Sequence, residues 1–349
     1  MKFDWTRLAR MPLYQTVWGG RAPAALEDAT PMSMWQWRRH VHADAGRSLL
    51  SHPALWVLHT VPGDDPIWVP FGPPDIVNGA AFARGMFTAA GILPGDMVLA
   101  VAPPAPWAGN TLPYLFSATD RLLPSDSPAL AQGLRPDTPP TGAEVFPLSV
   151  TTVAYKADLS AFPLSRLLSV VAGSPGEIDA LLQHAQRAGV APPRFRLALL
   201  VGPDAAEPRS IELAHTVVPL LYLPGLFAPL GGRPEAAGVW LPSEMLTAEI
   251  VLDDEWGRSV RDPSCIPQMR AVGAAVGESG ELVITVDNAA LPVIRLRTAI
   301  RIRVEENTPA GARVTLLTRP TVKPAAESIS AFTPAPNHSL RSGSGQARR

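Results

Sequence analysis

The chain of 349 residues has a formal net charge of −1 and only 17% charged residues, below the roughly 25% typical of soluble domains. This composition offers no electrostatic footprint for nucleic acid, and the longest apolar run, residues 217–230, is too short and too proline-rich to span a membrane. The single Cys265 excludes an internal disulfide and a multi-cysteine zinc site, and the N-terminus lacks an apolar signal core. We therefore expect a cytoplasmic protein with neither nucleic acid nor membrane among its partners.

In about the first two thirds of the chain, the sequence predicts strands that alternate with helices. Helices are expected over residues 33–50, 75–90 and 175–188, and strands over residues 55–59, 97–102, 167–172 and 196–201. Gly91 is placed to end the second helix, while Ser174, Pro175 and Glu177 form the capping box of the third. This alternation predicts an α/β protein with helix-covered, largely parallel sheets.

From about residue 217 the pattern changes to β. Strands are expected over residues 218–223, 248–252, 281–286, 300–304 and 314–318, with a charged turn at Asp253-Asp254-Glu255. The end of the chain is rich in Ser, Pro, Gly and Arg and cannot bury enough apolar surface to order itself. The predicted divisions are a first α/β subdomain at 1–155, a second at 156–235, a β-rich subdomain at 236–320 and a disordered tail at 321–349.

The stretch Gly280 to Thr298 carries the most specific pattern. By itself it predicts a β-hairpin with a basic end, because a strand is followed by an Asp287-Asn288 turn and by an extended segment from Pro292. Its residue order resembles the end of the large domain of adenylate-forming ligases, in the phenylacetate–CoA ligase-like branch. There a Gly-Glu-Leu strand precedes Pro-Leu-Ile-Arg-Tyr-Arg-Thr-x-Asp. The matching residues here are Pro292, Ile294, Arg295, Arg297 and Thr298, and Ile300 stands at the Asp position.

Two further segments resemble the same family. Residues 91–98, Gly-Ile-Leu-Pro-Gly-Asp-Met-Val, are similar to a segment before its second strand. Tyr14, followed by Gly19-Gly20-Arg21, is similar to its opening segment. The resemblance implies the fold of the large domain, and the roughly 50 residues after Thr298 are too few for the family's small C-terminal domain and its lysine.

The resemblance also implies a phosphate-binding loop after the strand at residues 55–59, where backbone amides would cradle phosphates. Thr60 and Gly63 echo that loop, but Pro62 and Pro66 have no N–H to donate. The carboxylates of Asp64 and Asp65, if about 4 Å from a phosphate, would each repel it by roughly 1 kcal/mol in water.

A second implied motif is an aromatic-Gly-x-Thr-Glu stretch whose Thr meets the phosphate and whose Glu helps to hold Mg²⁺. Tyr222 and Gly225 keep the aromatic residue and the glycine, but the Thr and the Glu are missing from residues 222–228. The ribose-binding Asp is likewise replaced by Ile300. These losses predict a degenerate nucleotide site with no catalytic residue, formed by Thr60, Gly63, Tyr222, Gly225, Arg295, Arg297 and Thr298.

The sequence therefore favours a non-catalytic member that binds a ligand or partner and needs no cofactor. The alternatives are an active AMP-forming acid–thiol ligase of unusual motif, which would use ATP and Mg²⁺, or one half of a two-chain ligase. Phe227 and Trp240 are the predicted substrate-cleft residues, and Trp240 stands where relatives carry the His of Gly-x-His. The cleft would accept a carboxylic-acid-like ligand.

Without a small domain, the apolar surface around residues 222–230 and 295–298 should be uncovered. Monomers rarely expose large apolar patches, so either the cleft collapses on itself or another subunit covers it. We favour a protein partner or a second copy, because the proline-stiffened loops are less able to collapse. No metal site is predicted, because His40 and His42 lie about 200° apart on a helix and cannot share a ligand face.

Overall fold

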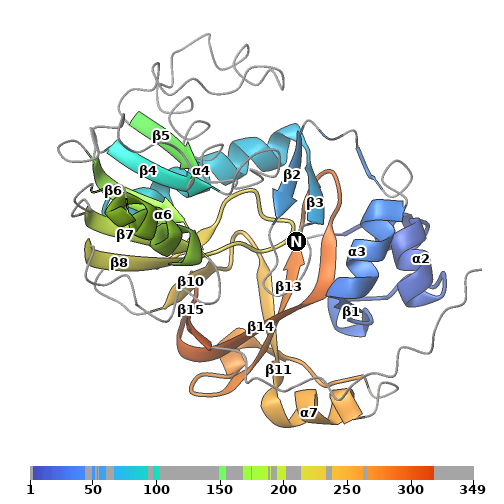
Figure 1. Ribbon diagram of the computed structural model, residues 1–349. Helices are drawn as coiled ribbons and strands as arrows, with labels where there is room; N and C mark the ends of the chain where they lie inside the picture. The colour runs from blue at the N-terminus through green and yellow to red at the C-terminus, as the bar shows by residue number, and fades with distance from the viewer. Residues whose placement is uncertain are drawn as a thin grey trace, which may run out of the picture. The chain divides into compact units, whose positions relative to one another are not determined.

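Two larger sheets and one strand pair build the computed structural model (Figure 1). It describes residues 3–43, 49–51, 53, 55–59, 67–92, 97–102, 149–154, 168–173, 175–187, 189, 195–201, 214–232, 238–261 and 266–317. Residues Met1–Thr318 cluster as one compact unit. The predicted phosphate-loop residues Thr60 and Gly63, and the predicted disordered tail, lie outside the described residues.

The first sheet, called here the parallel sheet, has the strand order β5-β4-β6-β7-β8-β9. Its strands are β4 (Met97–Ala102), β5 (Ser149–Ala154), β6 (Leu168–Gly173), β7 (Phe195–Val201), β8 (Ala214–Leu221) and β9 (Leu230–Gly231). All neighbours run parallel except the edge strand β9, which is antiparallel to β8. Helix α6 (Pro175–Arg187) contacts β4 and β6, as Figure 1 shows. The predicted helix-covered parallel sheet is confirmed.

The predicted division at residue 155 falls within this sheet, because β4 and β5 precede that residue and β6 to β9 follow it. The division into subdomains stays a prediction. Strand β2 (Leu55–His59) has the predicted bounds, but it pairs antiparallel with β3 (Ile67–Phe71) in a separate two-stranded sheet. Pro70 within β3 weakens the strand pattern there, because proline is confined to strand edges and ends.

Helix α4 (Pro73–Ala89) begins at a side-chain cap. The Asp75 carboxylate accepts hydrogen bonds from Gly72 N at 2.7 Å and from Ala289 N at 2.8 Å, so it joins the start of the helix to the turn before β14. Burial raises the pKa of the Asp75 carboxyl, and these backbone donors oppose the rise. Ile76, Ala80, Ala83 and Phe87, at helical spacing along α4, are buried, and Gly91, with φ of 93°, follows the end of the helix as expected.

The second sheet, called here the antiparallel sheet, has the order β10-β15-β14-β13-β11-β12, with β1 pairing parallel to β14. Its strands are β1 (Met32–Ser33), β10 (Val239–Pro242), β11 (Thr247–Leu252), β12 (Arg270–Ala271), β13 (Ser279–Val286), β14 (Val293–Thr308) and β15 (Gly311–Leu317). The predicted hairpin from residue 280 is present as β13 and β14, which run side by side in Figure 1. The two extended segments predicted after Pro292 are one continuous strand.

One local prediction in this half of the chain is wrong. Asp253-Asp254-Glu255, expected as a charged turn, forms the first turn of helix α7 (Asp253–Arg261). Acidic side chains suit this position, because the backbone dipoles place partial positive charge at a helix N-terminus. The Glu255 carboxylate also pairs with Arg258 and accepts a hydrogen bond from Gln268 N.

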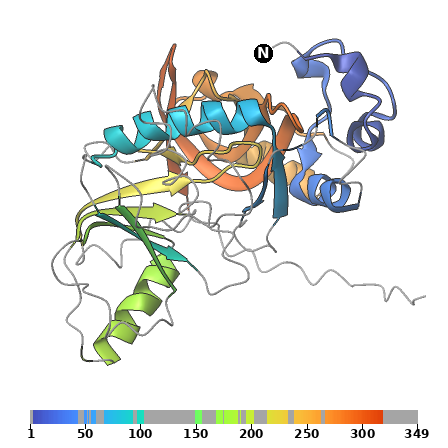
Figure 2. The same ribbon diagram turned by 90° about the horizontal axis from the view of Figure 1, so that it is seen from above.

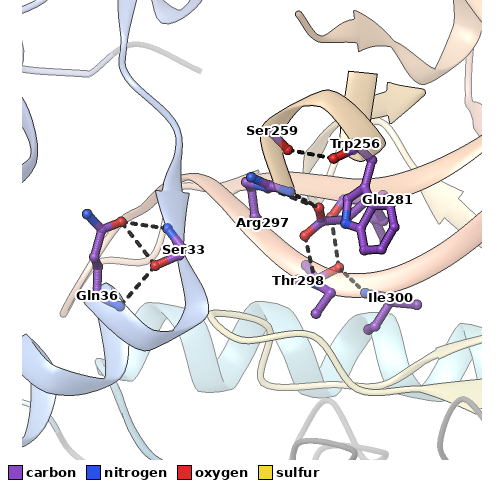
Figure 3. Close-up of polar contacts among 10 residues, drawn as sticks. Ser33, Gln36, Trp256, Ser259, Glu281, Arg297, Thr298 and Ile300 are labelled. Atoms are coloured by element: carbon purple, nitrogen blue, oxygen red, sulfur yellow. Dashed lines mark hydrogen bonds and ion pairs between the residues drawn. The ribbon is translucent and has the colours of Figure 1, made fainter. Parts of the chain in front are cut away.

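The N-terminal segment forms short helices, of which α3 contacts β14 of the antiparallel sheet. They are α1 (Trp5–Leu8), α2 (Pro12–Trp18), the 3₁₀ turn η1 (Leu26–Asp28) and α3 (Met34–Ala43). Later in the chain, the 3₁₀ turn η6 (Val272–Ala274) contacts β11, β14 and β15. Ser33 and Gln36 cap α3 reciprocally, since Gln36 N donates to Ser33 Oγ at 3.2 Å and Ser33 N donates to Gln36 Oε1 at 2.9 Å (Figure 3). A continuous hydrophobic core joins residues of α2, α3 and α4 with both sheets.

Figure 2 views the same elements from above, and α4, which contacts β9, extends across this view. Within the described ranges, no helix combines the length and the apolar character that crossing a membrane requires.

Candidate functional site

The residues that match the ligase pattern lie together at the start of β14, and Tyr14 of α2 reaches the same place. The Tyr14 hydroxyl donates to Pro292 O at 2.5 Å and accepts from Ile294 N at 3.2 Å. Complete burial raises the pKa of the Tyr14 hydroxyl far above its usual value, so it stays protonated and keeps donating. Two segments that resemble the ligases separately, near Tyr14 and near Pro292, are therefore joined by hydrogen bonds.

We expect Tyr14→Phe to destabilise the fold by about 1–3 kcal/mol, because it leaves the buried Ile294 N–H without its acceptor. Urea unfolding would measure the shift in midpoint at unchanged m-value. Thr16→Val is the matched control in the same helix, since its hydroxyl bonds only Pro12 O at the surface. Equal midpoints for the two variants would contradict the role assigned to Tyr14.

Arg295 is buried, and all three nitrogens of its guanidinium make hydrogen bonds within the chain. Nε and Nη2 bind the two carboxylate oxygens of Glu249 at 2.9 and 2.8 Å, and Nη1 donates to Glu27 O at 2.8 Å and to Ala29 O at 2.9 Å. Its own N–H donates to Thr285 Oγ1 at 2.9 Å, and its φ of 45° is unusual for a residue with a side chain. Arg295 thus anchors the N-terminal segment and β11 to β14.

Arg297 and Thr298 are also held by their own sheet. Arg297 Nε and Nη2 donate to one oxygen of the buried Glu281 carboxylate at 2.9 and 2.5 Å, and Ala299 N donates to its other oxygen at 3.0 Å (Figure 3). Thr298 Oγ1 donates to Leu282 O at 2.8 Å and accepts from Ile300 N at 3.2 Å. Together these bonds stabilise the irregular backbone at Ala299, whose φ is 57°.

Ile300, at the position of the family's ribose-binding Asp, is a buried side chain of the hydrophobic core. The surroundings of this position are therefore apolar. An ionised carboxylate at this position would pay a desolvation penalty unless it found a partner.

The segment after β8, which contains Tyr222 and Gly225, turns into the core. Leu226 is 2% exposed and Phe227 is 3% exposed, and the Phe227 ring meets Phe71 of β3 edge-on at 5.4 Å between centroids. Gly225 has a φ of 84°, and a Cβ at this residue would approach Val293 Cγ2 to 2.7 Å. The segment therefore lies directly against the start of β14.

This burial corrects the expectation of an uncovered apolar surface at residues 222–230. Leu223, Leu226 and Phe227 are buried within the chain itself. Phe227 packs against α4 and β3, and Gly225 lies against Val293 of β14. The predicted partner rested on that exposure, so it stays a prediction without that support.

Sequence reasoning missed three groups that organise this region. Glu249 and Glu281 neutralise the two pattern arginines, and the Asn288 side chain bonds Pro70 O at 3.2 Å and Ala290 N at 2.9 Å. Glu281 lies within the Gly-Glu-Leu strand, but the β13–β14 register sets it opposite Arg301 and sets Arg297 opposite Val283, with a register shift between them. Simple hairpin pairing therefore does not identify the Glu281–Arg297 pair. Glu249 is 46 residues from Arg295, and no local signal connects the two.

Trp240 lies apart from these residues. On β10, it lines a cavity of about 510 Å³ together with residues of α4, β9 and the β14–β15 hairpin. The structure therefore places Arg295, Arg297 and Thr298 on β14 and Gly225 against Val293 of the same strand. Phe227 lies against β3 and α4, and Trp240 lines a separate hollow. No group of three or more His, Cys, Asp or Glu side chains in the described part of the chain could hold a metal ion.

Comparison of the sequence with protein-family models and with curated proteins gives no match. Solved structures do match. A 2-hydroxyisobutyryl-CoA ligase in complex with 2-HIB-AMP and CoA has a TM-score of 0.60 at 16% identity, covering 90% of this chain and 67% of that chain. The same ligase in the postadenylation state has a TM-score of 0.61 at 15% identity, covering 90% and 65%. An acyl acid amido synthetase in complex with 2,4-DB has a TM-score of 0.56 at 11% identity, covering 89% and 65%.

The chain has the α/β fold of adenylate-forming ligases, as the sequence predicted. Identities this low show the fold alone, and the chain spans about two thirds of the length of the ligases that it matches. The shared fold shows neither that the chain belongs to the phenylacetate–CoA ligase-like branch nor that it lacks activity.

Proposed function

We propose that this chain is a phenylacetate–CoA ligase-like protein that binds a ligand or partner without activating an acid. The observation that carries the proposal is the burial of Leu226 and Phe227 in the core, at 2% and 3% exposure. The resemblance puts the Thr and Glu that handle phosphate and Mg²⁺ in this segment. Apolar side chains turned into a core cannot bind either group.

Charge balance supports the same proposal. Transfer of an adenylyl group needs surplus positive charge to stabilise the phosphates. The two arginines that match the ligase pattern supply no surplus positive charge, since Arg295 pairs with Glu249 at 2.8 Å and Arg297 pairs with Glu281 at 2.5 Å. Their guanidinium groups act as structural links within the fold.

A two-chain ligase is the second candidate. The chain spans about two thirds of the length of the ligases that it matches. In this candidate, a second polypeptide would supply further groups, a lysine among them. An active single-chain ligase of unusual motif would need ATP and Mg²⁺ held by residues other than those of the resemblance.

The test is ATP–pyrophosphate exchange with the purified chain, Mg²⁺ and a panel of aryl and acyl acids. We expect no exchange above the control without acid, because the buried segment at Phe227 offers no group to the phosphates. An intact ligase with its own acid serves as the positive control. Exchange by this chain alone would overturn the proposal, whereas exchange only after a second chain is added would establish the two-chain candidate.

A further inference from the structure

The hollow that contains Trp240 is a cavity of about 510 Å³. This volume falls within the roughly 300–1,000 Å³ of small-molecule sites in proteins. Its walls come from the C-terminal half of α4, the Gly231-Gly232 end of β9, the start of β10 and the β14–β15 hairpin. None of the residues that resemble the ligase nucleotide site lines it, so it is a different site.

One wall of the cavity is apolar and partly aromatic. Phe82 and Met86 of α4 and Trp240 of β10 supply it. Met86 is held close to β9, since a Cβ at Gly231 would lie only 2.6 Å from Met86 Sδ. Gly85 faces open space, with no heavy atom within 4 Å of an added Cβ, so the helix leaves room for a flat group there. Aromatic and thioether side chains favour contact with such a group.

The part of the cavity lining that comes from the β14–β15 hairpin includes a charged pair, and the two charges balance. Arg313 Nε donates to Glu306 Oε2 at 3.3 Å across the β14–β15 hairpin. This part of the lining can therefore donate a hydrogen bond from the guanidinium and accept one at the carboxylate. A ligand carboxylate placed here would face Glu306 as well as Arg313, so attraction and repulsion would largely cancel. A neutral group that both donates and accepts meets no such opposition.

We propose that this cavity binds a small, uncharged aromatic ligand of about one or two rings, whose hydroxyl or amide meets Glu306 and Arg313. The proposal deepens the ligand-binding function proposed above and rests on it. It also names a ligand class that differs from the carboxylic acid expected from the sequence.

The experiment uses two fluorinated probes, neutral 4-fluorophenol and anionic 4-fluorobenzoate, and follows their ¹⁹F line widths as the full chain is added. We expect 4-fluorophenol to broaden in a saturable manner, with a Kd of about 1 mM or tighter. Binding of 4-fluorobenzoate should be about tenfold weaker or more.

Gly85→Leu locates the binding. The added side chain enters the open space of the cavity, and leucine is a better helix former than glycine, so the fold should be kept. We expect it to weaken 4-fluorophenol binding by about tenfold or more. Thr88→Leu adds the same side chain to an exposed position of α4 that does not line the cavity, and it should leave binding unchanged. Ala89→Leu is a second occluding variant should Gly85→Leu fail to fold.

Three results would overturn the proposal. The first is that the unaltered chain does not broaden the ¹⁹F line of 4-fluorophenol. The second is that 4-fluorobenzoate binds as tightly as 4-fluorophenol. The third is that 4-fluorophenol binds both occluding variants as tightly as it binds the unaltered chain. Each is read without ATP, so it is distinguishable from failure of the non-adenylating proposal, which only pyrophosphate exchange can show.

Discussion

Replacing Phe227 with aspartate is expected to leave the purified protein largely unfolded at 25 °C. The side chain is 3% exposed, and its ring packs edge-on against Phe71. Phe227 also lies close to α4, since a Cβ added at Gly79 would approach Phe227 Cβ to 2.7 Å. Removing a buried phenylalanine costs about 3–5 kcal/mol, and a buried unpaired carboxylate adds several more. That sum rivals the roughly 5–15 kcal/mol stability of an ordinary domain.

Far-UV circular dichroism and size-exclusion chromatography would measure this loss. Phe227→Leu is the control, because it keeps an apolar side chain and should remain folded with a loss of about 1–2 kcal/mol. A surface position that merely contacted a partner would give the opposite pattern. A folded, soluble aspartate variant with an unchanged unfolding midpoint would show that Phe227 is not part of the core.

The secondary structure was predictable from sequence where local signals suffice. The bounds of β2 and β4 agree with their predictions, and α4 begins two residues before its predicted start. Apolar periodicity and glycine or proline punctuation fix such elements over a few residues. The prediction of a charged turn at Asp253 was wrong because three consecutive acidic residues suit both a solvated turn and the first turn of a helix.

The environment of the candidate site was not predictable in the same way. The resemblance located Phe227 and Arg295 along the chain, but their surroundings come from residues far away in sequence. Phe227 is buried by α4 and β3, and Arg295 by Glu249 and the carbonyl groups near Glu27. Burial and ion pairing of this kind depend on tertiary packing, which no single stretch encodes. An arginine that matches a family motif looks the same in the sequence whether its side chain binds a ligand or a neighbouring strand.

The Arg295–Glu249 pair gives the second large expected effect. The side chains are 7% and 12% exposed. Arg295→Ala would leave the Glu249 carboxylate buried without its partner, and breaking a buried pair from one side costs about 3–5 kcal/mol. Arg270→Ala is the matched control, because Arg270 and Glu278 form a pair at 3.3 Å with 56% and 41% exposure. Such an exposed pair contributes about 0–1 kcal/mol.

Urea unfolding of the two alanine variants and of the double variant Arg295→Met with Glu249→Leu would test this account. The double variant should recover much of the lost stability, since replacing both charges with apolar side chains leaves no buried ion unpaired. Hydrogen exchange adds a local measurement. Arg295 Nη1 holds Glu27 O and Ala29 O, so Arg295→Ala should speed amide exchange in residues 26–33 before it does so in β7. Equal losses for Arg295→Ala and Arg270→Ala, with uniform exchange, would mean that Arg295 does not anchor the N-terminal segment to β14.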